Sequence, residues 1–182
     1  LLLLLLLLPL LTLTPPPGEM ASTTTRKLVS QLPLCKENSG IRSGEERWQQ
    51  RLKEEYKALI ALIEHNKSVD NDWVTLAAID ARGTKWSGTV TVVHDHRTYK
   101  LRLEFEIPAT YPAVPPELAL PELDGKTAKM YVGGKICMDT HFRPLWSKNT
   151  PRFGIAHALV LGLAPWLAAE VPQLVARGVL GG

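Results

Sequence analysis

The segment Tyr99–Pro116 constrains the fold of this chain most, because in it a predicted strand is followed directly by a rigid proline-rich loop. Within it, apolar side chains alternate with charged ones: Leu101, Leu103, Phe105 and Ile107 against Arg102, Glu104 and Glu106. A period of two is typical of a strand with one buried face. Pro108 ends the run, and further prolines preset an extended backbone from Tyr111 to Pro116. The sequence therefore predicts a half-buried strand that ends in a rigid loop.

Other extended runs surround this strand. Trp73–Ile79 and Trp86–Val93 precede it, and Glu117–Leu120 follows as a short fourth run. Turn residues at Gly83 and at His94–Arg97 separate them. Because parallel strands need long crossover connections, these short links favour a four-stranded antiparallel meander.

A long amphipathic helix is predicted before the strands, from about Glu45 to about Glu64. Its apolar residues recur at helical spacing: Trp48, Leu52, Tyr56, Leu59, Ile60 and Ile63. Ser43 and Glu46 have the spacing of a capping box at its start. A shorter helix carrying Leu28, Val29 and Leu32 is expected to stop at Pro33.

The C-terminal part of the chain predicts two more helices. Ile155–Leu167 is apolar almost all round, which is typical of a buried helix. We expect Pro165 to end or kink it, Pro172 to open a last helix and Gly178 to stop that helix. Helices, a meander, a loop with a cysteine and further helices together indicate an α+β fold.

The sequence divides into three parts. Residues 43–182 form the predicted domain, and residues 20–42 an N-terminal extension with the short helix. The leucine- and proline-rich segment Leu1–Glu19 is expected to lie outside the fold, and we interpret it as translated from upstream of a natural start at Met20. A signal peptide is the alternative, but the tract lacks a basic start and a small-residue cleavage site, and it is too short to span a bilayer.

Composition narrows the function classes. The chain has 182 residues, enough for one domain with its own core. Its net charge of +3, without a basic run, argues against a nucleic-acid partner.

The cysteines, Cys35 and Cys137, form no CxxC pair, so neither a disulfide framework nor a zinc site is indicated. A thiol that must stay reduced predicts the cytosol or the nucleus.

Cys137 is the candidate catalytic residue. It ends the run Gly133-Gly134-Lys135-Ile136-Cys137, whose glycines leave the approach to the thiol open. Nearby cations favour the thiolate that attacks; here they are Lys129, Lys135 and Arg143. The alternative is a buried cysteine that only packs. We interpret Cys35, in a polar linker, as incidental.

The histidines decide which thiol chemistry is plausible. A cysteine protease needs a histidine base with an orienting partner, and the candidates are His141 and His157. We interpret His157, inside an apolar helix, as a core residue, and His141 has no evident orienter. Thioester exchange needs positioning and oxyanion stabilisation rather than a strong base, so it suits Cys137 better.

A strand ending in Pro108, the Tyr111–Pro116 loop, Cys137 and then Pro144 and Trp146 resemble the ubiquitin-conjugating enzyme fold. The resemblance runs from Leu28 to Leu180. Ordinary members carry His-Pro-Asn before the cysteine. This chain instead has Thr127-Ala128-Lys129, as in the conjugating enzymes for ubiquitin-fold modifier. After the cysteine that family has Leu-Thr-Asp-His, whereas here the residues are Met138-Asp139-Thr140-His141.

The resemblance implies a reaction and partners. Cys137 would accept ubiquitin-fold modifier as a thioester from its activating enzyme and yield it to target lysines with a ligase. The enzyme would need no cofactor of its own, since the activating enzyme consumes ATP, and neither nucleic acid nor membrane insertion is implied. The asparagine assigned to the oxyanion has no counterpart, so Lys129, the Thr127 hydroxyl and backbone N–H groups around Gly134 are candidates; the alternative is that residues 127–129 form a solvated loop.

Two other readings remain at this point. An inert interaction module can share the fold, because Tyr111 and the prolines of its loop are structural and do not by themselves indicate activity. The ending Leu180-Gly181-Gly182 is similar to the tail of a ubiquitin-like modifier, although it follows a predicted helix rather than a strand.

Overall fold

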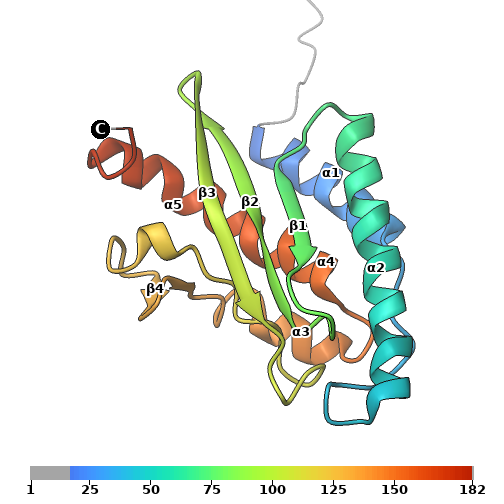
Figure 1. Cartoon of the computed structure of the whole chain (residues 1–182). Helices are drawn as coiled ribbons and strands as arrows, with labels where there is room; N and C mark the ends of the chain where they lie inside the picture. The colour runs from blue at the N-terminus through green and yellow to red at the C-terminus, as the bar shows by residue number, and fades with distance from the viewer. Residues whose placement is uncertain (1–16, 182) are drawn as a thin grey trace, which may run out of the picture.

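The computed structural model describes the chain from Pro17 to Gly181, and its side chains from Thr23 onward. Figure 1 shows three strands side by side, flanked by one long helix and crossed on one face by another. The helical elements are α1 (Pro17–Gln31), α2 (Glu45–Ser68), η1 (Pro121–Leu123), α3 (Arg143–Asn149), α4 (Ile155–Ala158), η2 (Leu159–Leu163) and α5 (Ala164–Ala176). The strands are β1 (Val74–Ala78), β2 (Lys85–His94), β3 (Arg97–Glu106), β4 (Met130–Tyr131) and β5 (Lys135–Ile136). This arrangement confirms the predicted α+β class.

The central sheet is an antiparallel meander in the order β1-β2-β3. The predicted fourth strand is wrong in extent: it pairs with β3 through Ala119 alone, whose N–H and C=O bond the backbone of Glu104 at 2.8 and 3.0 Å. Pro116 and Pro121 bracket this segment and have no N–H to donate, so the ladder cannot lengthen on either side. The turn at His94–Arg97 is confirmed, with positive φ at its centre.

Helix α2 confirms the long amphipathic prediction and extends it to Ser68. Its predicted capping box is wrong, because Gly44 is the N-cap and no side chain caps the helix. The Ser43 hydroxyl instead accepts a bond from the N–H of Gly40 at 3.1 Å, which closes the preceding turn. Ile60 faces solvent rather than the core, and Tyr56 is partly exposed while its ring packs on Trp86.

Helix α1 begins at Pro17, so it includes residues that were expected to lie outside the fold, and it ends before Pro33 as predicted. Leu32 is buried and Leu28 and Val29 pack against the core. The remainder of the leucine- and proline-rich segment lies outside the described residues.

The predicted pair of C-terminal helices is wrong, because α4, η2 and α5 form one continuous helix from Ile155 to Ala176. The π-helical segment η2 bonds the N–H of Ala164 to the carbonyl of Leu159, one residue further than in an α-helix. This shift lets the chain pass Pro165, which cannot donate to the preceding turn. Gly178 stops the helix as predicted, at φ 70° and with its N–H bonded to the Val175 carbonyl at 2.9 Å.

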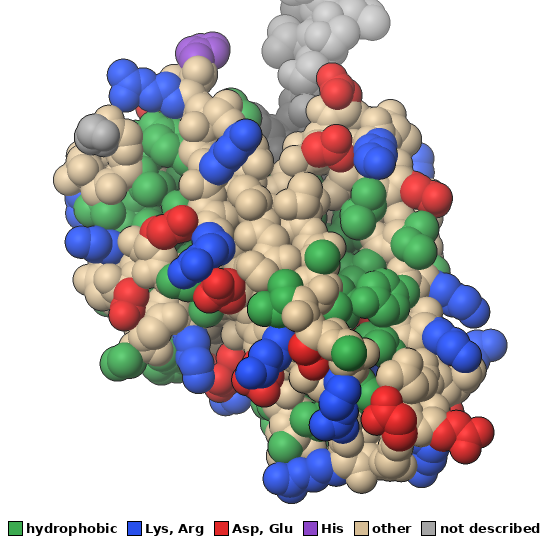
Figure 2. Space-filling model, in the orientation of Figure 1, with side chains coloured by type: hydrophobic (Ala, Val, Ile, Leu, Met, Phe, Trp, Pro, Cys, Tyr) green, Lys and Arg blue, Asp and Glu red, His purple; other side chains and the backbone are tan. Residues whose placement is uncertain are grey.

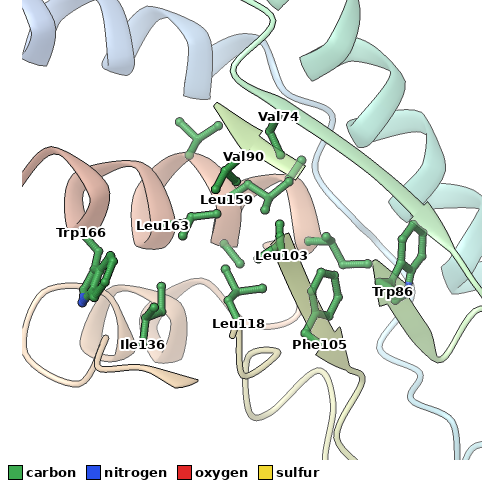
Figure 3. Close-up of a cluster of buried hydrophobic side chains, with 14 of the residues drawn as sticks. Val74, Trp86, Val90, Leu103, Phe105, Leu118, Ile136, Leu159, Leu163 and Trp166 are labelled. Atoms are coloured by element: carbon green, nitrogen blue, oxygen red, sulfur yellow. The ribbon is translucent and has the colours of Figure 1, made fainter. Parts of the chain in front are cut away.

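That C-terminal helix is long and apolar enough to cross a membrane by length and composition, and 56% of its most apolar window is buried inside the protein. The burial is that of a core helix. In Figure 3, Leu159 and Leu163 meet Val90 and Leu103 of the sheet. Ile136 and Trp166 continue this core toward the β4–β5 hairpin.

A buried polar cluster ties the loops to the helices. Arg51 of α2 has a fully buried side chain whose guanidinium donates to Glu55 Oε1 at 2.7 Å and to the carbonyls of Glu37 and Phe153 at 2.7 Å. The Tyr111 hydroxyl donates to the same Glu55 carboxylate. The cluster thereby fixes the N-terminal linker, the proline-rich loop and the segment before α4 against α2.

Candidate functional site

Cys137 directly follows β5, at the end of a short hairpin. Met130 pairs with Ile136 across that hairpin, and the N–H of Cys137 donates to the carbonyl of Lys129 at 3.0 Å. The Ile136 side chain is buried, whereas the thiol-bearing residue is half-buried. The sheet core therefore holds the backbone of Cys137 while leaving its side chain open to solvent.

The hairpin turn is organised by Asp124. Its Oδ1 accepts the N–H groups of both Gly133 and Gly134 at 3.0 Å, and both glycines have positive φ. A Cβ on Gly134 would lie 2.6 Å from the Leu120 carbonyl oxygen, so this position requires glycine. Because these N–H groups already have an acceptor, the expectation that they serve as oxyanion donors is not supported by the geometry.

Residues Thr127-Ala128-Lys129 are attached to the core by hydrogen bonds. The Thr127 hydroxyl donates to Oε2 of the buried Glu170 in α5 at 2.6 Å and accepts the N–H of Lys129 at 3.2 Å. The indole N–H of Trp166 donates to the Lys129 carbonyl at 3.0 Å. The segment is therefore bound to α5 rather than solvated along its whole length, and it supports the strand partner of Cys137.

The three cations predicted to lie near Cys137 differ in whether a carboxylate already pairs with them. Lys135 pairs with Glu117 at 2.6 Å, and Arg143 pairs with Asp139 at 3.2 Å. Lys129 is exposed, and its ammonium has no ion-pair partner among the side chains of residues 23–181. Of the three, Lys129 is the cation whose charge is not already compensated.

A tyrosine and an aspartate adjoin the thiol, and the sequence analysis did not identify either as a site residue. The Cys137 thiol lies 3.6 Å from the Tyr131 hydroxyl, which donates to Asp139 Oδ2 at 2.5 Å. The hydrogen bond to Asp139, with a smaller effect of Cys137, raises the pKa of Tyr131 well above its usual value. The sequence held one signal that could have pointed to Asp139. This carboxylate lies one residue nearer to the cysteine than the aspartate of the family pattern does.

The histidines lie away from the thiol. His141 Nε2 is 3.1 Å from the carbonyl of Gly162 in η2. His157 is fully buried, stacks on Phe153 and accepts the Gly154 N–H at Nδ1, 3.2 Å away. Burial, and then the nearby Arg51 charge, lower the pKa of His157 to about 4. In the described part of the chain neither imidazole bonds Cys137, so the structure forms no cysteine–histidine pair.

The segment after Cys137 packs on the π-helical turn. A Cβ at Gly162 would lie 2.5 Å from the Met138 sulfur and 3.2 Å from the Phe142 ring. Trp146 is buried beneath this loop and donates to the Pro112 carbonyl at 2.8 Å, whereas Pro144 is exposed. Gly162 thus allows the close contact that places the thiol loop on the core.

Cys35, which we interpreted as incidental to the chemistry, is buried although its linker is polar in sequence. It is 1% exposed, and its Sγ lies 3.8 Å from Glu55 Oε1. Burial, with the Glu55 charge, raises the pKa of the Cys35 thiol to about 12. Among the described residues no three His, Cys, Asp or Glu side chains gather as metal ligands would.

Comparisons with known proteins identify the family of this chain. The sequence profile of the family described as Ubiquitin-fold modifier-conjugating enzyme 1 matches residues 25–181. The protein of that name from Danio rerio is 55% identical over 161 residues, covering 88% of this chain and 96% of that protein. Its namesake from Oryza sativa subsp. japonica is 59% identical over 156 residues, covering 86% and 84%.

A solved structure is also similar, at a lower level. It is the crystal structure of the H. polymorpha ubiquitin conjugating enzyme Pex4p in complex with the soluble domain of Pex22p. The TM-score is 0.42 at 19% identity, over 76% of this chain and 90% of that chain.

Proposed function

This chain belongs to the ubiquitin-fold modifier-conjugating enzyme family and is a transferase of ubiquitin-like conjugation, and we propose that it carries the modifier as a thioester on Cys137. The observation that supports Cys137 most is the contrast between the two thiols. The backbone of Cys137 is held by Lys129 and its side chain is open, whereas Cys35 is buried beside a carboxylate. A thiol must be accessible and able to form the thiolate in order to attack.

The proposed reaction has two steps. In the first, the Cys137 thiolate attacks the thioester between modifier and activating enzyme; a new C–S bond forms and the old one breaks, with its electron pair on the activating enzyme's sulfur. In the second, a target amine attacks the Cys137 thioester, and the thiolate of Cys137 leaves. Bond types in the first step are the same before and after, so catalysis consists of positioning and oxyanion stabilisation.

Lys129 is the proposed oxyanion donor. Its carbonyl bonds the N–H of Cys137, so its side chain starts beside the reacting residue, and its ammonium is not paired within the described chain. The alternative N–H donors of Gly133 and Gly134 are already bound to Asp124. Thr127, through Glu170, is proposed to order the loop that carries Lys129.

The remaining proposals concern partners and location. The modifier, its activating enzyme, a ligase and target proteins are the proposed partners in ufmylation, with ATP consumed by the activating enzyme and no cofactor on this chain. Acidic and basic side chains are interspersed on the face in Figure 2, which gives no support to a nucleic-acid partner. The unpaired thiols favour a reducing compartment, the cytosol or nucleus.

The test is thioester formation on a non-reducing gel. Incubation with activating enzyme, ATP and ubiquitin-fold modifier should give a band that a thiol reductant removes. Cys137→Ser should form no reducible band, because an oxygen nucleophile gives an ester, while Cys35→Ala should charge normally. A reducible band of the same size in Cys137→Ser would refute the assignment. Efficient charging with ubiquitin and its own activating enzyme would refute the selectivity.

A second test addresses Lys129. Single-turnover discharge of the preformed thioester should slow about 10²–10³-fold in Lys129→Ala, as for loss of an oxyanion donor. Lys126→Ala, which removes an exposed lysine from the same loop, is the matched control. Equal discharge in both variants would return Lys129 to the role of a surface charge.

A further inference from the structure

We propose that a groove along α5, separate from Cys137, binds a short basic and apolar segment of a partner protein. The groove has a volume of about 560 Å³, which is within the usual size of a binding pocket. Its walls are the loop Asp70–Trp73, the end of β2 from Thr91 to His94, and one side of α5 between Ala164 and Pro172. The loop and the end of β2 lie at the same end of the sheet (Figure 1), where the Trp73 carbonyl accepts the Thr91 N–H at 2.7 Å. This site is called the α5 groove below.

Small side chains on the helix leave the space of the α5 groove. Ala164, Ala168 and Pro172 line it at intervals of four residues, so they lie on the same side of α5. Across from them, Val93 of β2 is 70% exposed. An apolar side chain of a bound segment would cover this valine and the small helix residues, and it would thereby remove apolar surface from water.

The indole N–H of Trp73 points to a hydrogen-bonding ligand in the same groove. The other four tryptophans each donate their indole N–H to a backbone carbonyl: Trp48 to Arg82, Trp86 to Gly83, Trp146 to Pro112 and Trp166 to Lys129. Trp73 is half-buried in the groove wall, and its indole N–H has no acceptor within residues 23–181. A backbone carbonyl of a bound segment would supply the acceptor that a tryptophan at an interface usually finds.

The charge of the groove selects a basic segment. Asp70 and Asp72 are exposed, and neither carboxylate is bonded to a side chain in the part of the protein whose side chains are described. Among the described residues that line the groove there is no lysine or arginine, and its one histidine, His94, lies 3.4 Å from Asp95. A lysine or arginine would therefore meet two uncompensated carboxylates and no cationic side chain of comparable strength. The same carboxylates disfavour nucleic acid and anionic lipid.

Helix α5 separates this groove from the thiol. Its Trp166 and Glu170 hold the hairpin segment from Thr127 to Lys129. Ala168 lies two positions from each of them, which places it on the opposite side of an α-helix. A segment bound in the α5 groove therefore leaves Cys137 open. The groove suits an anchor that holds a partner both before and after the thiol reacts.

The experiment selects the segment from random short peptides displayed on phage, with the full chain as bait. Ala168→Lys places a cation in the groove at an exposed helical position, and Ala169→Lys, exposed on the same turn but outside the groove, is the matched control. Peptides that bind the parent and Ala169→Lys but not Ala168→Lys should carry lysine or arginine next to apolar residues. Replacing both Asp70 and Asp72 by Asn should weaken them at least about tenfold, as for loss of hydrogen bonds to charged groups.

Nuclear magnetic resonance of the indole N–H groups then locates the peptide. Its addition should shift the Trp73 signal and leave those of the four bonded tryptophans in place. Thermal unfolding of each variant verifies that it is folded, and if Ala168→Lys were unfolded, the double Asn variant alone would decide. The inference is overturned if the selection yields no groove-dependent peptide, if the peptides lack basic residues, or if the Trp73 signal does not move. Equal binding to Ala168→Lys would place the peptide on another surface, which also overturns it.

Discussion

The two cysteines of this protein each lie beside a trio of the same residue types, a tyrosine, a carboxylate and an arginine. The inner trio, beside Cys35, comprises Tyr111, Glu55 and Arg51; the outer trio, beside Cys137, comprises Tyr131, Asp139 and Arg143. In both trios the tyrosine donates to the carboxylate. In both, the arginine forms an ion pair with that carboxylate, and the two residues lie four positions apart in the sequence. The two trios differ in their exposure to solvent, since the inner arginine and carboxylate are fully buried and the outer ones are about half exposed.

The difference in burial gives the same three residue types different roles in the two trios. The Arg51 guanidinium reaches backbone carbonyls from several segments, so the inner trio joins loops that are far apart in sequence. A buried charge left without its partner is costly, and the arrangement is therefore fixed. The outer trio gains little from its ion pair, because water screens it. Its hydrogen bonds can be exchanged at small cost, which suits a site whose cysteine alternates between a thiol and a thioester.

The largest expected difference between the two regions is thiol reactivity. Relative to its usual pKa of 9.0, a pKa of about 12 leaves Cys35 with about a thousandth of the thiolate at pH 8, and Cys35 is also inaccessible. Iodoacetamide should therefore label Cys35 at least about a thousandfold more slowly in the folded protein than in the unfolded chain, and far more slowly than the accessible Cys137. Peptide mass spectrometry over time measures both rates. In urea, where burial is lost, the rates should converge; comparable rates without urea would contradict the burial of Cys35.

Stability should separate the two arginines. Arg51→Ala leaves the Glu55 carboxylate buried without its partner, which typically costs about 3–5 kcal/mol. Arg143→Ala breaks an exposed pair of the same spacing and should cost less than about 1 kcal/mol. Urea unfolding followed by tryptophan fluorescence gives both free energies of unfolding. Similar losses would show that the inner trio does not depend on burial for its effect.

The elements that follow local rules could be predicted from the sequence. The alternation in β3, the helical spacing in α2 and the glycine stop at Gly178 are each set by residues close together in the chain. The errors occurred where the same local residues can form more than one hydrogen-bond pattern. Pro165 does not break its helix because η2 changes the bonding register before it, and Ser43 is occupied by a turn that the capping-box pattern does not describe.

The residues of the candidate site also divide into those that the sequence could indicate and those that it could not. Cys137 could be proposed as the catalytic residue because its neighbours along the chain resemble a family, and Thr127 and Lys129 were named on the same basis. The outer trio was missed, because Tyr131 and Asp139 meet across the hairpin and no spacing rule predicts that contact. The inner trio was missed for a stronger reason. Arg51 and Glu55 look like a surface i,i+4 pair, and only the fold reveals that loops from both ends of the chain cover them.

His157 provides a smaller, pH-dependent test of the inner region. Its pKa falls from 6.5 to about 4 on folding because it is buried and close to Arg51. The unfolded chain therefore binds this proton at a pH where the folded protein does not, and stability should fall as pH drops from about 6.5 to about 4. One proton contributes at most about 1.4 kcal/mol per pH unit. The free energy of unfolding of His157→Gln should be less steep than that of the parent over this range, and parallel curves would contradict the shift.

The last test concerns Thr127, where the two regions meet. This residue joins the hairpin of the outer trio to the buried Glu170, so Thr127→Ala removes one hydrogen bond and leaves a buried carboxylate oxygen without that donor. Such a loss costs about 1–3 kcal/mol, less than the loss of Arg51 because a water molecule can approach from the hairpin side. Thr127→Ser keeps the hydroxyl and should restore most of the stability. Thioester formation should decline in Thr127→Ala and recover in Thr127→Ser, because Lys129, whose carbonyl bonds the N–H of Cys137, lies two residues after Thr127. If Thr127→Ala instead lost charging at unchanged stability, Thr127 would act on the reaction itself rather than through the order of its loop.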